Sequence, residues 1–248
     1  MSFPMYDLPE LEDANDALVT AFEMLALEAG VDPPIAPVTQ ICGYPLQTVD
    51  RGKYTLLGIP CYRLTGCDGP AHRSFIVVSR SSRAKTIRDL RGGSFALNSL
   101  DSNTGMNLPR RSFAAIAQRK PFFNNVIVTG SHRSSMRAVV QGQADAAAID
   151  CVTFGLHADY NPAAIAGLRI LAHTSASPGI PFVTARTTSR RTVGSLRRAL
   201  QTFSTHAGFV PLRKALRIER IAPPSETAYD VVLHYAAEAA ALGYPELT

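Results

Sequence analysis

Short apolar segments bounded by turn-forming residues recur along this sequence, and in its middle they alternate with segments of helical periodicity. Runs of four or five such residues are typical of buried strands. The predicted strands are residues 55–59, 74–78, 94–97, 125–128, 146–149, 168–171 and 181–185. Alternation of strands and helices favours a mostly parallel sheet with helices on both faces, so we predict an α/β fold.

The helices are predicted from apolar spacing and from their end signals. The spacing of apolar residues over 18–25 predicts an amphipathic helix that ends before Gly30. Residues 86–89, Thr-Ile-Arg-Asp, are typical of a capping box at a helix start. Further helices are predicted over 104–118, 134–140, 152–158, 193–203 and 229–239.

The last third of the chain determines the predicted domain organisation. No strand pattern returns after Ala185, so the final helices need a sheet from elsewhere to cover. Packing them onto the N-terminal strands gives two lobes, each a mostly parallel sheet flanked by helices. We predict residues 1–78 and 184–248 as lobe 1 and residues 79–183 as lobe 2. The extended segments 75–80 and 182–186 are the two expected hinge strands.

Composition excludes several classes of protein. With 46% hydrophobic and 18% charged residues in 248, the chain has enough apolar material for a globular core. The net charge of +5 comes from dispersed Lys and Arg residues, whereas a nucleic-acid site needs a basic stripe. The sequence also lacks Trp, so we expect no nucleic-acid partner.

The four cysteines do not indicate a metal site. Cys42, Cys61, Cys67 and Cys151 form no C-x-x-C pair and have no companion histidine at zinc-ligand spacing. We therefore expect neither a metal nor a cofactor. Cys61 and Cys67 are close enough for a disulfide in an oxidising compartment, although buried thiols are the favoured interpretation.

Residues 1–10 contain no basic start and no apolar run, so we predict that they are neither a signal peptide nor an anchor. No later stretch approaches the roughly 20 apolar residues of a membrane helix, so we expect a soluble protein that is not inserted in a membrane. The predicted compartment is the periplasm if a leader has been removed, and the cytoplasm if Met1 is the native start.

The candidate site comes from the residues that follow the predicted strands, because ligands of open α/β sheets bind beyond the carboxyl ends of the strands. Ser102, Asn103, Thr104 and Gly105 follow one strand and open a helix. Free amide groups and the positive helix dipole there favour an anion, and Gly105 allows the backbone to approach it. Alternatively, Ser102 or Asn103 is only a helix N-cap.

Other strand ends provide further candidates. Ser131 and His132 open a second strand-to-helix turn of the same type, although Ser131 also suits an N-cap and a lone His is often a surface residue. Asp150 follows an apolar run, where it suits a cationic group of a ligand or, equally, an N-cap. The remaining candidates are Tyr6, Cys42 and Tyr44 from lobe 1, although the two tyrosines suit rim or core packing equally well.

A Ser-His-Asp hydrolase is an alternative, because Ser102, His132 and Asp150 are all present. The sequence has no G-x-S-x-G elbow, and capping explains each of these residues at a helix start. A Cys-His enzyme has no identifiable partner for Cys42 or Cys151. We predict no catalytic residues.

Six segments in order along the chain resemble the phosphate/phosphonate-type substrate-binding proteins of ABC transporters, which have the type II periplasmic-binding-protein fold. The segments are PMYD at 4–7, QICGYPL at 40–46, GCDGP at 66–70 leading to RSFIVV at 73–78, DSNTGMN at 101–107, VTGSHRSS at 128–135 and GQADAAAID at 142–150. This resemblance implies an anion at the turn of Ser102 to Gly105, with Tyr6 and Tyr44 from the first lobe. It also implies that His132 and Asp150 face the other end of the ligand.

The expected function is that of a non-catalytic solute-binding protein. It would trap a small anionic or zwitterionic ligand, such as a phosphonate or phosphate ester, in an interlobe cleft by hinge closure. An ABC permease is the expected macromolecular partner. The alternatives are a small-molecule enzyme of cofactor biosynthesis on the same two-lobed fold, and a cytoplasmic ligand sensor.

Overall fold

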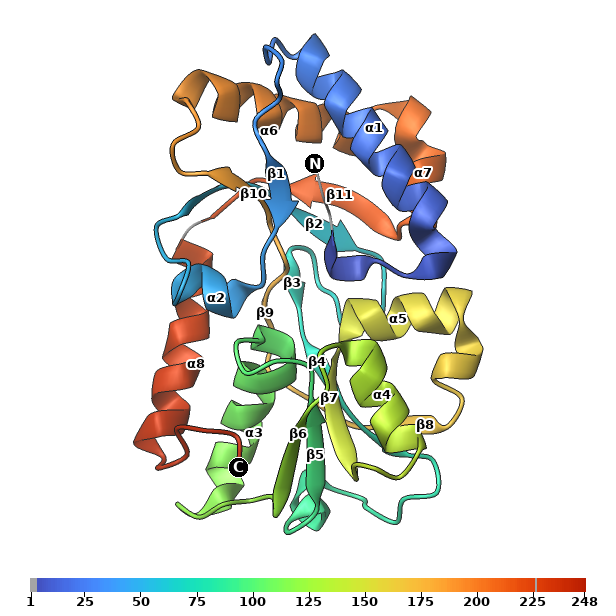
Figure 1. The fold of residues 1–248 in the computed structure, drawn as a ribbon, viewed down its shortest axis with the longest axis vertical. Helices are drawn as coiled ribbons and strands as arrows, with labels where there is room; N and C mark the ends of the chain where they lie inside the picture. The colour runs from blue at the N-terminus through green and yellow to red at the C-terminus, as the bar shows by residue number, and fades with distance from the viewer. Residues whose placement is uncertain (1–3, 226) are drawn as a thin grey trace. The chain divides into compact units, whose positions relative to one another are not determined.

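The computed structural model describes residues 4–225 and 227–248, so the first three residues of the N-terminal segment considered above lie outside it. The chain forms two compact units (Figure 1). Unit 1 contains the described residues up to Ala71 together with Pro178–Tyr229, and unit 2 contains His72–Ser177 together with Asp230–Thr248. Over the described residues, every helix is too short or too polar to cross a lipid bilayer.

Unit 1 is built on a sheet that has, among the described residues, four strands in the order β1-β10-β2-β11. The strands are β1 (Val38–Gln40), β2 (Tyr54–Tyr62), β10 (Phe182–Ala185) and β11 (Ile218–Ala222). The helices are α1 (Glu12–Glu28), α2 (Gly43–Gln47), α6 (Arg190–Thr205) and α7 (Val210–Ala215), with 3-10 turns at Pro4–Tyr6, Pro9–Leu11, Ala207–Phe209 and Thr227–Tyr229.

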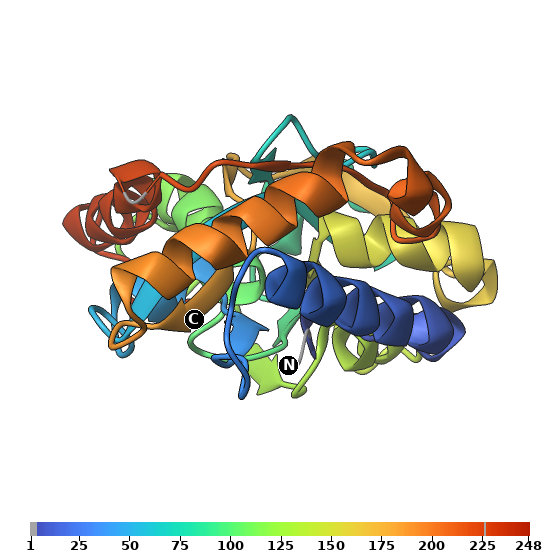
Figure 2. The same cartoon turned by 90° about the horizontal axis from the view of Figure 1, so that it is seen from above.

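The main core of unit 1 lies between its sheet and two long helices. Figure 2 shows α1 and α6 side by side. Phe22 of α1 and Leu196 and Phe203 of α6 are buried together with Leu57 of β2. These helical residues repeat at the spacing of one helix face, so burial of that apolar face holds both helices on the sheet.

Unit 2 is built on a sheet with five described strands in the order β6-β5-β7-β4-β8. The strands are β4 (Ser74–Ser79), β5 (Ser94–Leu97), β6 (Asn125–Val128), β7 (Ala146–Asp150) and β8 (Leu168–His173). The helices are α3 (Leu108–Ala117), α4 (His132–Val140), α5 (Cys151–Tyr160) and α8 (Asp230–Ala241), with a π-helical turn at Asn103–Asn107 and 3-10 turns at Ile87–Leu90 and Pro162–Ala164.

An aromatic cluster forms part of the core of unit 2. The rings of Phe95, Phe113, Phe122 and Phe123 lie in contact, with neighbouring centroids 4.8 to 5.6 Å apart. Phe95 comes from β5 and Phe113 from α3, so the cluster fixes this helix on its strand. Such ring pairs stabilise a core beyond the area that they bury.

The prediction of mostly parallel sheets is wrong. β5 is parallel to β6 and β7, but β4 is antiparallel to both of its neighbours, β7 and β8. All three ladders of the unit 1 sheet are antiparallel. In each sheet, strands joined by a helical crossover are parallel to each other. A strand from a distant part of the sequence lies between two such strands and is antiparallel to both.

The predicted hinge strands fall inside the two sheets. β4 occupies most of segment 75–80, β10 most of segment 182–186, and each pairs with a strand on both sides. The chain instead passes between the units at residues 71/72 and 177/178, within the short strands β3 (Ala71–His72) and β9 (Ser177–Pro178), and for a third time at 229/230. These bounds differ from the predicted lobes 1–78 with 184–248 and 79–183.

Helix α8 accounts for the third passage. The predicted lobe 1 includes this helix, but in the structure it packs against α3 of unit 2. The guanidinium of Arg111 in α3 pairs with Glu238 and lies 4.2 Å from the ring centroid of Tyr235. The Tyr235 hydroxyl donates to the carbonyl of Ala176 at 3.0 Å. These contacts hold residues 230–248 in unit 2.

Each of the seven predicted strands is present, and residues 94–97 and 125–128 have the predicted bounds. The prediction that no strand follows Ala185 is wrong, because β11 lies at Ile218–Ala222. β11 reads Ile-Glu-Arg-Ile-Ala and has two exposed charged residues, which conceal it from a search for apolar runs. All four cysteines are free thiols in the structure, and Cys61 and Cys151 are buried.

Candidate functional site

In the structure, the residues after β5 form the turn into a helix from which the sequence predicted an anion site. Ser102 caps the π-helical turn that continues into α3, and its Oγ accepts the amide of Gly105 at 2.9 Å. The N-cap alternative is therefore realised for Ser102. The amide of Thr104, at the start of the same turn, has no carbonyl partner inside the helix and stands at its positive end.

The turn after β6 meets this first turn. Ser131 caps α4, and its Oγ accepts the amide of Ser134 at 3.0 Å. His132 is the first residue of α4 and is half-buried, and its Nε2 lies 3.1 Å from Oγ1 of Thr104. The two turns come together because β5 and β6 are adjacent and parallel, so that their carboxyl ends coincide at Leu97 and Val128.

A third element contributes a buried ion pair. Nδ1 of His72 lies 3.0 Å from Oδ2 of Asp150, and these side chains are only 4% and 2% exposed. The other oxygen of Asp150 accepts the amides of Val152 and Thr153 at 2.8 and 3.1 Å. Asp150 is thus the N-cap of α5 and the partner of His72 at once. Direct contact of Asp150 with a ligand stays a prediction.

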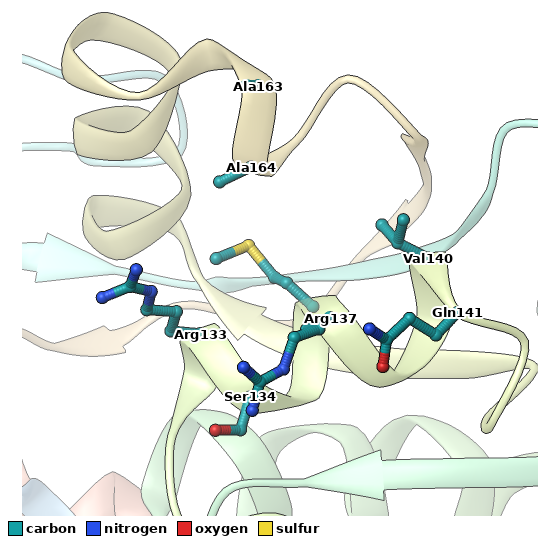
Figure 3. Close-up of a pocket in the computed structure, with 8 residues that line it drawn as sticks. Arg133, Ser134, Arg137, Val140, Gln141, Ala163 and Ala164 are labelled. Carbon is teal, nitrogen blue, oxygen red and sulfur yellow. The ribbon is translucent and has the colours of Figure 1, made fainter.

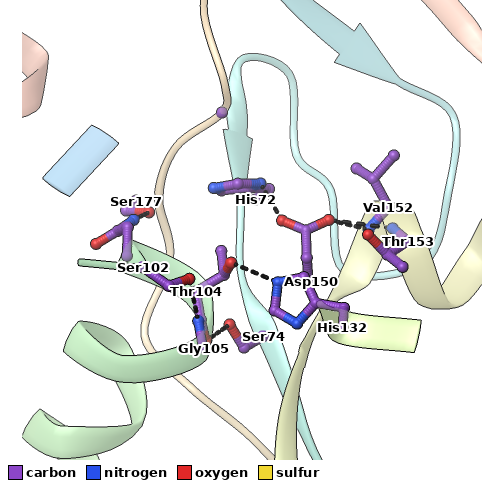
Figure 4. A network of polar contacts seen from close by, with 12 residues as sticks. His72, Ser74, Ser102, Thr104, Gly105, His132, Asp150, Val152, Thr153 and Ser177 are labelled. Carbon is purple, nitrogen blue, oxygen red and sulfur yellow. Dashed lines mark hydrogen bonds and ion pairs between the residues drawn. The ribbon is translucent and has the colours of Figure 1, made fainter. Parts of the chain in front are cut away.

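Figure 4 shows the His72–Asp150 pair beside the His132–Thr104 pair. Burial by itself lowers the pKa of His72, but the carboxylate of Asp150 raises it above the ordinary value. Burial by itself raises the pKa of Asp150, but His72 and His132 lower it below the ordinary value. Burial lowers the pKa of His132. Asp150 is therefore charged at neutral pH, and His132 is an uncharged imidazole.

The backbone is tightly fitted at Gly105. A Cβ atom there would lie 1.7 Å from Oδ1 of Asn98 and 3.2 Å from Oγ of Ser102, so a larger residue would displace the carboxamide of Asn98. Asn98 directly follows β5 and was missed from the sequence, as was His72. The rule that ligand residues follow strand ends would have selected Asn98, whereas a lone His in a short strand has no sequence signal.

Asn103 is fully buried and its carboxamide is used within unit 2. Its Nδ2 donates to Oγ of Ser177 at 2.8 Å, and its Oδ1 accepts from Nδ2 of Asn107 at 3.2 Å. Asn107 also donates to the carbonyl of Val232, which links the turn to α8. Asn103 therefore holds the turn in place, and its contact with a ligand stays a prediction.

The other predicted ligand residues belong to unit 1. Tyr6 is buried, with its ring edge-on to Tyr62 at 5.2 Å between centroids. Cys42 precedes α2 and is half-buried, as is Tyr44 within α2. Their role in ligand binding stays a prediction.

The residues of the hydrolase alternative do not form a catalytic triad. Nε2 of His132 faces Thr104, while Oγ of Ser102 accepts the Gly105 amide. Asp150 has His72, not His132, as its ion-pair partner. The arrangement lacks the nucleophile-to-base contact that activates a serine.

A separate cavity of about 580 Å³ lies between α4 and the 3-10 turn Pro162–Ala164 in unit 2 (Figure 3). Arg133, Arg137 and Met136 line it from α4, and Ala163 and Ala164 line it from the 3-10 turn that follows α5. No residue of the predicted ligand set lines this cavity. The predicted site is thus a different feature from this hollow.

Residues 46–229 match the model of a protein family described as "ABC transporter, phosphonate, periplasmic substrate-binding protein". The match includes both turns and the His72–Asp150 pair, whereas Tyr6, Cys42 and Tyr44 precede it. A search of curated protein sequences found no significant match.

Three solved structures are similar to this chain. The binding protein component of an ABC phosphonate transporter from Pseudomonas aeruginosa has 14% identity and a TM-score of 0.72, with 90% of this chain and 73% of that chain covered. A protein from Prochlorococcus marinus in complex with methylphosphonate has 14% identity and a TM-score of 0.63, with 89% and 82% covered. A chloride-bound protein from Xanthomonas citri has 15% identity and a TM-score of 0.66, with 94% and 92% covered. At these identities the likeness shows the periplasmic-binding-protein fold.

Proposed function

Because the chain belongs to the family of phosphonate-binding periplasmic substrate-binding proteins of ABC transporters, we propose that it captures a small phosphonate or phosphate ester for uptake. The observation that carries this proposal is the contact between the turns after β5 and β6, where Thr104 Oγ1 lies 3.1 Å from His132 Nε2. Two helix starts and their hydroxyl donors thereby converge within unit 2.

These groups can bind an oxyanion without the help of a cationic side chain. Amide groups at helix starts and a hydroxyl donate hydrogen bonds to oxygen atoms, and the helix dipoles favour negative charge. We propose that the anion is bound at the turn of Ser102–Gly105 by the amide and the hydroxyl of Thr104, because the amides of Ser102 and Gly105 already donate to the Ser99 carbonyl and to Oγ of Ser102. His132 is neutral, so it contributes one hydrogen bond and adds no net charge to the site.

We propose that the buried pair of His72 and Asp150 positions His132 and the start of α5 instead of contacting the anion. Both side chains are almost fully buried, and the carboxylate already accepts hydrogen bonds from two amides and forms an ion pair with an imidazole. An uncompensated carboxylate beside the ligand would repel it, and His72 offsets that charge. The proposed contacts of Tyr6, Cys42 and Tyr44 would add hydrogen-bond donors from unit 1.

We propose binding without catalysis, in keeping with the family, whose members are binding proteins for transport. An enzyme on this fold would need a residue that exchanges a proton with the ligand at a useful pH. Asp150 remains ionised and accepts hydrogen bonds from two amides, and Nε2 of His132 faces the hydroxyl of Thr104. An ABC permease is the proposed recipient of the ligand, and the periplasm is the proposed compartment.

The test is a thermal-shift and calorimetric screen of the purified protein. The ligands are methylphosphonate, which is bound by the Prochlorococcus marinus protein, and phosphate, phosphate monoesters, sulfate and carboxylates. A ligand at 100 times its Kd stabilises the folded state by about 2.7 kcal/mol, which raises Tm by several degrees. We expect the largest rise with a phosphonate or phosphate ester.

Two valine substitutions locate the site. Thr104→Val removes the hydroxyl that faces His132, and we expect at least about tenfold weaker binding of the best ligand. Thr20→Val is the matched control, because that exposed hydroxyl donates to the carbonyl of Asp16 within its own helix. Equal affinity in the Thr104→Val protein, or a screen in which no oxyanion binds, would refute the proposal.

A further inference from the structure

The cavity between α4 and the 3-10 turn Pro162–Ala164 combines cationic and apolar groups, and the proposed phosphonate site gives it no role. Figure 3 shows its lining. Half of the eight lining residues are apolar, two are arginines and none is acidic, so the cavity suits a ligand that is both apolar and negatively charged. Its volume of about 580 Å³ is within the range of about 300–1,000 Å³ that small-molecule sites occupy.

The two arginines carry charge that no described residue compensates. Arg133 and Arg137 are exposed, and neither guanidinium makes a hydrogen bond or an ion pair with any part of the described chain. Because they are four residues apart on one helix, they lie on the same face and their charges repel. Arg133 is also in the first turn of α4, where the helix dipole disfavours a cation. Such departures from helix stability are expected at functional positions.

The apolar part of the wall is held in place by the rest of unit 2. Met136 is 1% exposed, so it forms the floor of the cavity, and its flexible thioether chain can adapt to the shape of a ligand. Val140 is 47% exposed, and its methyl groups lie 3.2 Å from the position that a Cβ atom of Gly167 would take. The backbone of Gly167 therefore supports Val140 from the inner side, while its outer side contributes apolar surface to the cavity.

We propose that this cavity binds a carboxylate that carries an alkyl chain, such as a medium-chain fatty acid. The guanidinium of Arg137 would donate paired hydrogen bonds to the carboxylate, and Arg133 would add positive potential. The chain would lie against Met136 and Val140, opposite the small side chains of the 3-10 turn. A small inorganic anion would leave this apolar surface in water, and a neutral chain would leave the two charges without a partner.

The first test varies the length of the chain at constant charge. Acetate, hexanoate, octanoate and decanoate are compared by calorimetry. Each methylene group that enters the cavity should lower Kd by about two- to fourfold. Decyltrimethylammonium has the same chain length as decanoate and the opposite charge, so we expect it to bind at least about tenfold more weakly. The proposal is overturned if wild-type protein binds no carboxylate, if Kd does not depend on chain length, or if the cation binds as well as decanoate.

The second test assigns the binding to this cavity. Arg137→Gln removes a lining guanidinium at an exposed position, and we expect about tenfold weaker binding of decanoate. Arg88→Gln is the matched control, because Arg88 is also an exposed arginine of unit 2 and does not line the cavity. Ala164→Leu fills part of the cavity without a change of charge and should weaken decanoate binding by at least about tenfold. Wild-type affinity in Arg137→Gln or in Ala164→Leu, or an equal loss in Arg88→Gln, would refute the assignment.

Two further measurements separate this cavity from the proposed phosphonate site. Arg137→Gln should bind methylphosphonate with wild-type affinity, and Thr104→Val should bind decanoate with wild-type affinity. If Thr104→Val instead weakens decanoate binding and Arg137→Gln does not, the carboxylate binds at the turn after β5 and the cavity proposal is wrong. A protein that binds decanoate as described but no phosphonate would refute only the proposed function.

Discussion

Replacing Asp150 with asparagine separates the two roles of this buried side chain. The substitution keeps an oxygen atom that accepts the amides of Val152 and Thr153, and thus keeps the cap of α5. It removes the negative charge that faces Nδ1 of His72 at 3.0 Å. The expected loss of stability therefore reports the charge interaction with His72 and not the helix cap.

The magnitude follows from burial. Removing one partner of a buried ion pair costs about 3–5 kcal/mol. The asparagine amide can donate a hydrogen bond to the unprotonated ring of His72, and this bond recovers part of the lost stability. We therefore expect Asp150→Asn to lower the free energy of unfolding by about 2–3 kcal/mol. For a chain of 248 residues, each kcal/mol lowers Tm by about 2–4 °C. Asp150→Ala also loses the cap and should cost about 1 kcal/mol more.

The pH dependence of this loss gives the sharper test. The raised pKa of His72 means that the pair stabilises the protein below the ordinary value of 6.5, and that this contribution disappears as pH rises through the raised pKa. The lowered pKa of Asp150 means that its contribution is present above the ordinary value of 3.8 and disappears as pH falls through the lowered pKa. The difference between wild type and Asp150→Asn should therefore be largest between these two values.

The assay is urea unfolding of wild type and Asp150→Asn from pH 4.5 to pH 9. Ser189→Ala is the control, because Ser189 caps α6 by accepting the amide of Thr192 at 3.1 Å and has no ionisable partner. We expect this control to lose about 1 kcal/mol at every pH. An Asp150→Asn loss that is equally constant with pH would refute the assigned charge interaction.

Two other substitutions test contacts within unit 2. Gly105→Ala places a Cβ atom 1.7 Å from Oδ1 of Asn98, so we expect a loss of about 1–3 kcal/mol in urea unfolding together with weaker ligand binding in calorimetry. Arg111→Ala removes the guanidinium that lies 4.2 Å from the ring centroid of Tyr235, and should cost about 1 kcal/mol with ligand affinity unchanged. A Gly105→Ala protein with wild-type stability, or an Arg111→Ala protein with altered affinity, would contradict these assignments.

The local pattern of apolar residues predicted where the strands of this fold lie better than it predicted how they pair. The strands at 94–97 and 125–128 have their predicted bounds because a short apolar run ends in both cases at a turn residue. The direction of β4 was not predictable in this way, because its neighbours β7 and β8 lie about 70 and 90 residues further along the chain. Periodicity describes a strand's own faces and carries no information on which distant strand pairs with it.

For the candidate site as well, the residues at strand ends could be predicted, but a contact that depends on strand pairing could not. Thr104 and His132 follow adjacent parallel strands, so the rule of strand ends selects both, and the structure joins them. His72 lies in a two-residue strand and meets Asp150 because Ser74, two residues later, pairs with Asp150 across β4 and β7. That antiparallel register could not be read from the sequence, so the ion pair could not be predicted.

The placement of α8 in unit 2 has a consequence for the order in which the protein can fold during its synthesis. Unit 2 begins at residue 72, yet the amide of Phe122 donates to the carbonyl of Thr248 at 2.6 Å. Unit 1 in turn needs residues 178–229 to complete its sheet. Domains of many chains fold one after another as they leave the ribosome. Here the part of the chain up to Ser177 completes neither unit, so both must finish folding after residues beyond 177 have been made.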